Sequence, residues 1–193
     1  MRLFVAIEMS RSVEESARDV IDDLRARVSR VAPRARITWA APERLHVTIR
    51  FIGQADEARV QAIRAALGAT IDAPGFDVTV EGVGTFPPRG APRVFWAGLT
   101  DGRDGILEVE RAVSQRLDTL VPAEARPYAP HLTLARVKEP AGLTTAPVLE
   151  GLATRHFGRM HVDAITLFES RLSSKGPTYV PLQRTALRRS NRT

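Results

Sequence analysis

Cysteine is absent from the 193-residue sequence. Without a thiol there can be no disulfide framework, no thiolate metal site and no cysteine nucleophile. The sequence also lacks any apolar run of about 18 residues, the length that a membrane-spanning helix requires. The apolar stretch near the start, residues 3–7, is too short for a signal peptide, and no small-residue cleavage site follows it. We therefore expect a cytoplasmic protein with no membrane partner.

Lysine is almost as scarce, since it occurs only at Lys138 and Lys175 and arginine carries nearly all of the positive charge. The formal net charge is +6 and the isoelectric point is about 10.8. A basic surface suits a polyanion such as a nucleic acid, but a compositional preference for arginine would give the same charge. The charge alone therefore leaves nucleic-acid binding open.

Histidine occurs four times, and two of these residues begin the same four-residue pattern. His46-Val47-Thr48-Ile49 and His131-Leu132-Thr133-Leu134 both follow His-x-Thr-x with an apolar residue at each x. Side chains of a strand alternate between its two faces. The histidine and threonine of each tetrad would then share one face, above an apolar underside. If the two tetrads face each other, they form a symmetric site with two imidazoles and two hydroxyls.

The apolar pattern predicts an α+β fold. Helical spacing predicts a helix that begins with a capping box at Ser12 and Glu15, and two more over 56–67 and 104–120. A loop is predicted over the Gly- and Pro-rich residues 82–92. Strands are predicted over residues 3–8, 37–39, 46–51, 76–81, 93–99, 131–137, 162–172 and 179–187.

Adjacent strands with few helices between them favour antiparallel sheets. Because each tetrad lies in strand-rich sequence with a helix nearby, we expect two lobes, each with an antiparallel-rich sheet and outer helices, related by a pseudo-twofold axis. Residues 1–187 would form this single two-lobed domain, and residues 188–193 a basic, flexible tail.

Two facing imidazoles suit general acid–base catalysis, because a side chain with a pKa near 6.5 exists in both forms at neutral pH. The neutral ring can take a proton from water, and the protonated ring can give one to a leaving oxygen. The threonine hydroxyls can hydrogen-bond to an anionic oxygen, so a phosphoryl group fits between the tetrads. No acidic cluster accompanies the histidines and the His-Glu-x-x-His pattern is absent, so no metal is expected. A metal held by both histidines and outside carboxylates stays open.

The tetrads and their surroundings resemble the two-histidine phosphoesterase superfamily, and within it the RNA 2',3'-cyclic phosphodiesterases, also called 2'-5' RNA ligases. Neither tetrad alone is specific, but together with its flanking phrases the resemblance covers nearly the whole chain, from residue 2 to about 187. The phrases are Arg2–Ile7, Leu45–Gly53, Pro92–Trp96, Pro130–Arg136 and Leu167–Ser170.

This resemblance implies a bilobal fold with a central cleft that both tetrads line. It implies a monomer that hydrolyses RNA-terminal 2',3'-cyclic phosphate to a 2'-phosphate without metal or cofactor, with reversible 2'-5' ligation in some members. RNA ends, with tRNA fragments as a candidate source, would be the partner. His46 would be the proton donor to the 3' oxygen and His131 the proton acceptor. Thr48 and Thr133 would hold phosphate oxygens, and Arg136 would balance the phosphate charge.

Three more residues are candidate substrate contacts. Arg50 has the parity of His46 in a regular strand, so we expect it on the cleft face unless it is a solvated strand end. Phe51 and Tyr128 could stack on a base, with core packing as the alternative. Two other functions remain open: a non-catalytic module that binds RNA ends, and the same chemistry on a small cyclic nucleotide or a 2'-5' oligonucleotide.

Overall fold

The computed structural model describes residues 1–124, 126–173 and 176–189. Within them no helix is long and apolar enough to cross a membrane. A 3₁₀ turn, η1, covers Pro42–Arg44. The other elements are β1 (Arg2–Glu8), α1 (Arg11–Val31), β2 (Arg36–Trp39), β3 (His46–Gln54), α2 (Glu57–Ala66), β4 (Ile71–Pro74), β5 (Phe76–Phe86), β6 (Val94–Leu99), α3 (Arg103–Leu117), β7 (Leu132–Glu139), α4 (Ala146–Leu149), β8 (His156–Val162), β9 (Ala164–Ser173) and β10 (Gly176–Arg188).

The strands form one path in the order β4-β10-β9-β1-β3-β7-β6-β5-β8, with β2 added on β7. The two halves of this path meet at a single residue pair, Val47 of β3 and Leu132 of β7. Outward from this pair, the first lobe has β3, β1, β9 and β10, and the second lobe has β7, β6, β5 and β8. All of these neighbours are antiparallel. The expected α+β class is confirmed, and the two expected sheets are joined at their centre.

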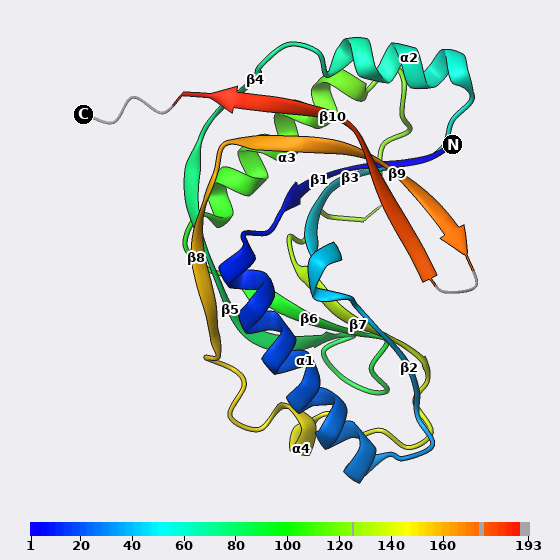
Figure 1. Cartoon of the computed structure of the whole chain (residues 1–193), viewed down its shortest axis with the longest axis vertical. Helices are drawn as coiled ribbons and strands as arrows, with labels where there is room; N and C mark the ends of the chain where they lie inside the picture. The colour runs from blue at the N-terminus through cyan, green and yellow to red at the C-terminus, as the bar shows by residue number, and fades with distance from the viewer. Residues whose placement is uncertain (125, 174–175, 190–193) are drawn as a thin grey trace.

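The main helix that packs on each lobe follows, along the chain, a strand of the other lobe. α1 follows β1 of the first lobe but packs against β7 and β8 of the second. α3 follows β6 of the second lobe but packs against β3 and β4 on the first lobe's side. Figure 1 shows α2 and α3 with the half that contains β9 and β10, and α1 and α4 with the other half. This exchange fits the expected pseudo-twofold arrangement and places the junction of β3 and β7 between the lobes.

Two local expectations are corrected near α1 and β5. The hydroxyl of Ser10, not that of Ser12, caps α1 by accepting a hydrogen bond from the amide of Val13 (3.4 Å). β5 continues to Phe86 through the residues expected to form a loop. The strand continues through position 82 because this residue is glycine. Gly82 has a positive φ of +77°, and a β-carbon there would lie only 2.6 Å from the carbonyl oxygen of Ala153.

The C-terminal expectations also change in detail. The single strand expected over 162–172 is two strands, because β8 ends at Val162 and β9 begins at Ala164. The strand expected over 179–187 runs through Arg188, whose guanidinium pairs with the carboxylate of Asp72 at 3.1 Å. Arg188 therefore belongs to the fold rather than to the tail, and residues 190–193 of the expected tail lie outside the described residues.

Candidate active site

The junction of β3 and β7 brings the two tetrads together. Val47 and Leu132, the first x of each tetrad, are the paired residues, and both are almost fully buried. The histidine and threonine of each tetrad are only partly buried. Because the pairing is antiparallel, continuing the register by one residue sets His46 opposite Thr133 and His131 opposite Thr48. The histidine of each tetrad therefore lies across the strand pair from the threonine of the other tetrad.

The last residue of each tetrad is a β-bulge. Ile49 is the extra residue between Thr48 and Arg50, opposite Val5 and Ala6 of β1. Leu134 is the extra residue between Thr133 and Ala135, opposite Phe95 and Trp96 of β6. An extra residue in a strand moves each side chain that follows it to the face of the sheet opposite the one that regular alternation would give it. The expected alternation therefore holds within each tetrad and inverts after it.

Arg50 is the residue that this inversion moves, and its expected place on the cleft face is wrong. Its side chain is 5% exposed. Its guanidinium donates hydrogen bonds to the hydroxyl of Ser114 on α3 (3.2 Å) and to the carbonyl of Pro122 (2.9 Å). Ala135, the matching position of the second lobe, is 1% exposed. Both positions thus belong to the buried side of their strands.

The next position in each strand returns to the site face. Phe51, which is 54% exposed, pairs with Phe4, and Arg136, also exposed, pairs with Val94. The ring centroid of Phe4 lies 4.9 Å from that of His46, which shows that this face carries the tetrads. The first lobe therefore offers an exposed aromatic ring at the position where the second lobe offers a guanidinium.

The two imidazoles are held in the same way. Nδ1 of His46 lies 2.8 Å from the carbonyl oxygen of Arg44, and Nδ1 of His131 lies 2.7 Å from that of Ala129. A carbonyl oxygen can only accept, so Nδ1 carries a proton in both rings. In the neutral rings Nε2 is then the nitrogen with a free lone pair, which is the atom that can exchange a proton with substrate or water.

Burial lowers the pKa of both imidazoles below the usual 6.5. The hydrogen bond to the carbonyl opposes this effect in each ring, and the positive charge of Arg136 adds to it. The pKa of His46 is lowered further by the charge of His131. Both rings are therefore mainly neutral at neutral pH, and an anion bound between them would favour protonation.

Aromatic rings that the sequence did not single out pack around the histidines. The ring of Tyr179 lies 5.1 Å from that of His46, nearly perpendicular to it. The ring of Phe86 lies 5.1 Å from that of His131 in a similar arrangement. Tyr179 and Phe86 come from β10 and β5, so only the sheet topology brings them to the tetrads.

Tyr128 connects the segment before β7 to β3. Its hydroxyl donates a hydrogen bond to the carbonyl of Thr48 (2.9 Å), and its ring packs against the main core. Burial raises the pKa of the phenol, so it stays protonated and remains a donor. This placement favours core packing over base stacking for Tyr128.

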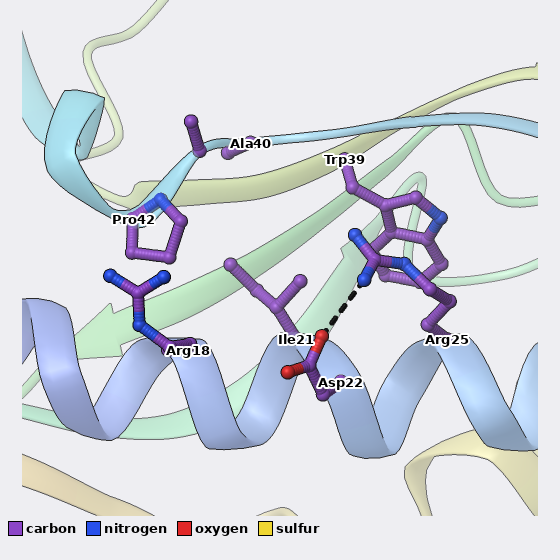
Figure 2. A pocket seen from close by; sticks show the side chains of 8 residues that line it. Arg18, Ile21, Asp22, Arg25, Trp39, Ala40 and Pro42 are labelled. Carbon is purple, nitrogen blue, oxygen red and sulfur yellow. Dashed lines mark hydrogen bonds and ion pairs between the residues drawn. The ribbon is translucent and has the colours of Figure 1, made fainter.

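A separate hollow lies between α1 and the segment that leads to the first tetrad (Figure 2). Trp39 lies in its wall, with the guanidinium of Arg25 5.5 Å from its ring centroid and the ring of Phe95 6.4 Å away on the core side. Arg25 also bonds to Asp22, as Figure 2 shows. The other lining residues are Arg18, Ile21, Ala40, Ala41 and Pro42, so among the described residues neither tetrad lines this hollow.

A model of the 2'-5' RNA ligase superfamily matches residues 13–173. The chain belongs to this superfamily. A curated relative from Archaeoglobus fulgidus, named RNA 2',3'-cyclic phosphodiesterase, is 32% identical over 183 residues, which cover 95% of this chain and 98% of the relative. A relative of the same name from Thermus thermophilus is 32% identical over 198 residues, which cover 97% and 91%.

Two solved structures share the fold of this chain. The crystal structure of TT0787 of Thermus thermophilus is 28% identical, with a TM-score of 0.79 and coverage of 99% of this chain and 100% of that chain. E. coli LigT is 24% identical, with a TM-score of 0.71 and coverage of 96% and 97%, and shows the same fold.

The side chains that meet at the junction limit the chemistry that this place in the fold could support. They are two imidazoles, two hydroxyls and, within electrostatic range, one guanidinium. Among the described residues, no group of three or more histidine and carboxylate side chains could hold a metal ion. The set that is present can bind an anionic oxygen and move protons on both sides of it.

Proposed function

We propose that this protein hydrolyses the 2',3'-cyclic phosphate ends of RNA to 2'-phosphates by paired-histidine acid–base catalysis. The observation that carries the proposal is the pairing of Val47 with Leu132, because its register sets the histidine of each tetrad opposite the threonine of the other. Curated relatives at 26–32% identity named RNA 2',3'-cyclic phosphodiesterase support this substrate class. The net charge of +6 suits a polyanionic partner.

In the proposed mechanism a water molecule attacks phosphorus in line with the bond to the 3' oxygen. Nε2 of His131 takes a proton from that water as the new P–O bond forms. His46 gives a proton to the 3' oxygen as the old bond breaks, so a 2'-phosphate and a free 3' hydroxyl result. The roles of donor and acceptor rest on the family resemblance, because the two tetrads have nearly the same geometry.

Charge that gathers on the non-bridging oxygens would be stabilised from both lobes. The hydroxyls of Thr48 and Thr133 would donate hydrogen bonds to these oxygens, and the exposed guanidinium of Arg136 would balance their charge. The same step with a 5' hydroxyl in place of water would form a 2'-5' phosphodiester from the cyclic phosphate and free the 3' hydroxyl, and its reversal would re-form the cyclic end; this is the ligation that we include in the proposal. A monomer in the cytoplasm, with no metal or cofactor, remains our prediction for the working form.

The test is turnover of an RNA oligonucleotide with a 2',3'-cyclic phosphate end in the presence of EDTA. We expect a 2'-phosphate product, and a loss of about 10³-fold or more in kcat for His46→Ala and for His131→Ala. His161→Ala is the matched control, because that imidazole is bonded to Asp77 and takes no part in the proposal. Full activity of either tetrad variant would overturn the mechanism.

The remaining outcomes distinguish the alternatives. Binding of the oligonucleotide without any product would favour the non-catalytic module. Activity that EDTA abolishes would favour a metal enzyme. If kcat/KM were much higher for a small cyclic nucleotide or a 2'-5' oligonucleotide than for the cyclic-phosphate RNA, the proposed chemistry would stand but its substrate would be the other compound.

A further inference from the structure

The first lobe has a small aromatic cluster apart from the main core. Phe4, Ala6 and Phe168 form it, with Tyr179 packed against them. The rings of Phe4 and Phe168 are stacked at 5.3 Å, and that of Tyr179 lies 5.1 Å from Phe4. Since Phe4 also touches the ring of His46, this cluster lies on the face that carries the tetrads. The cluster therefore adjoins the place where a substrate between the tetrads would lie.

Arg2 and Tyr179 lie in one row across this face. Ser170 of β9 pairs with Tyr179 of β10, and Leu3 of β1 pairs with Glu169. Continuing that register by one residue sets Arg2 beside Ser170. Paired residues share a face, so the exposed side chain of Arg2 lies on the side of Tyr179.

Arg44 approaches the same tyrosine from the segment before the first tetrad. Its guanidinium donates a hydrogen bond to the carbonyl of Pro177 (2.6 Å), two residues before Tyr179, and its own carbonyl holds His46. Burial raises the pKa of the Tyr179 phenol, and the positive charges of Arg136, Arg44 and Arg2 oppose this effect, so all three guanidinium groups lie within electrostatic range of the hydroxyl. The nearest acid along β9, Glu169, has the opposite strand parity and pairs with Arg171 at 2.8 Å. This end of the face is thus positively charged.

We propose that Arg2, Arg44 and the hydroxyl of Tyr179 form a second subsite that binds the phosphodiester preceding the terminal ribose. The site adjoins the reacting group, because the ring of Tyr179 contacts that of His46. Guanidinium groups and a phenol hydroxyl are suitable donors to a phosphodiester oxygen. The inference rests on the proposed function, and it makes an oligonucleotide with a cyclic phosphate end a better substrate than a cyclic mononucleotide.

The test compares two dinucleotides that end in 2',3'-cyclic phosphate, one with a normal internucleotide phosphodiester and one with an uncharged methylphosphonate in its place. For the unaltered protein we expect kcat/KM to be about tenfold higher for the charged dinucleotide. Arg2→Gln and Arg44→Gln should each remove most of this preference, whereas Arg30→Gln, a surface change at the end of α1, should retain it.

The outcomes separate the two proposals. Turnover of both dinucleotides at equal kcat/KM by the unaltered protein would overturn the subsite and leave the proposed function standing. An unchanged tenfold preference in both Arg2→Gln and Arg44→Gln would also overturn the subsite. No turnover of either dinucleotide or of a cyclic mononucleotide would overturn the proposed function, and the subsite with it.

Discussion

One carbonyl oxygen beside each imidazole determines which nitrogen is available for chemistry. The carbonyls of Arg44 and Ala129 each lie two residues before a tetrad histidine and fix the proton on Nδ1. A strand pattern alone predicts the shared face of histidine and threonine, but not this hydrogen bond. The two rings are thus equivalent in their hydrogen bonding and differ in their neighbours: His46 meets Phe4 and Tyr179, and His131 meets Phe86.

The lowered pKa of both imidazoles predicts the pH dependence. In the free protein the singly protonated pair is most abundant below pH 6.5, so the optimum of kcat/KM should lie on the acid side of 6.5. A bound phosphate anion raises both pKa values, so the kcat profile should shift to higher pH. The two apparent values belong to the pair of rings. Steady-state kinetics between pH 4 and 9 measure both profiles, and a kcat/KM optimum well above 6.5 would contradict the account.

A substrate with sulfur in place of the 3' oxygen should separate the roles of the two histidines. A thiolate leaves without protonation, so the proton donor becomes dispensable on this substrate. His46→Ala should then lose about tenfold or less in kcat, while His131→Ala should keep its loss of about 10³-fold. The opposite pattern would exchange the assigned roles.

Arg50 should matter for stability rather than for turnover. Arg50→Met removes the hydrogen bonds to Ser114 and Pro122 and leaves the Pro122 carbonyl without this donor. We expect the free energy of unfolding to fall by about 2 kcal/mol in urea titrations. If the variant were as stable as the unaltered protein but turned over cyclic phosphate a hundredfold more slowly, Arg50 would have a role in the active site instead.

The bulges at Ile49 and Leu134 are the elements that shape the site, and they could not be predicted from the sequence. Both residues are ordinary apolar strand residues in the pattern, without a glycine to mark an irregularity. A regular strand puts Arg50 on the site face and Arg136 on the buried face. In the structure Arg50 is on the buried face and Arg136 is on the site face. Strand alternation therefore predicts the faces correctly within each tetrad and wrongly for the residues that follow it.

The bulge at Leu134 makes a testable distinction between two neighbouring positions. Arg136→Ala should lower kcat/KM by about 10- to 100-fold, because a charge-assisted contact to phosphate is lost. Adding Ala135→Arg to this variant should not restore activity, since position 135 is 1% exposed on the opposite face, and should also reduce stability. Arg136→Lys is the milder control. Rescue by the arginine at position 135 would show that the strand is regular there in solution.

The whole molecule is two similar lobes that exchange helices around one residue pair. The sequence predicted the α+β class, most strands and the two tetrads, because each depends on local apolar patterns. It did not predict Tyr179, Phe86 or Arg44 at the site, because these residues reach the tetrads only through the pairing of distant strands.

A crystal structure with the 2'-phosphate product bound would test most directly whether both histidines act on one phosphate. We predict that Nε2 of His46 and Nε2 of His131 each lie about 3 Å from an oxygen of the phosphate or the freed 3' hydroxyl. We also predict the hydroxyls of Thr48 and Thr133 on the non-bridging oxygens. A phosphate that contacts only one imidazole, or that lies away from the pair of Val47 and Leu132, would contradict the account.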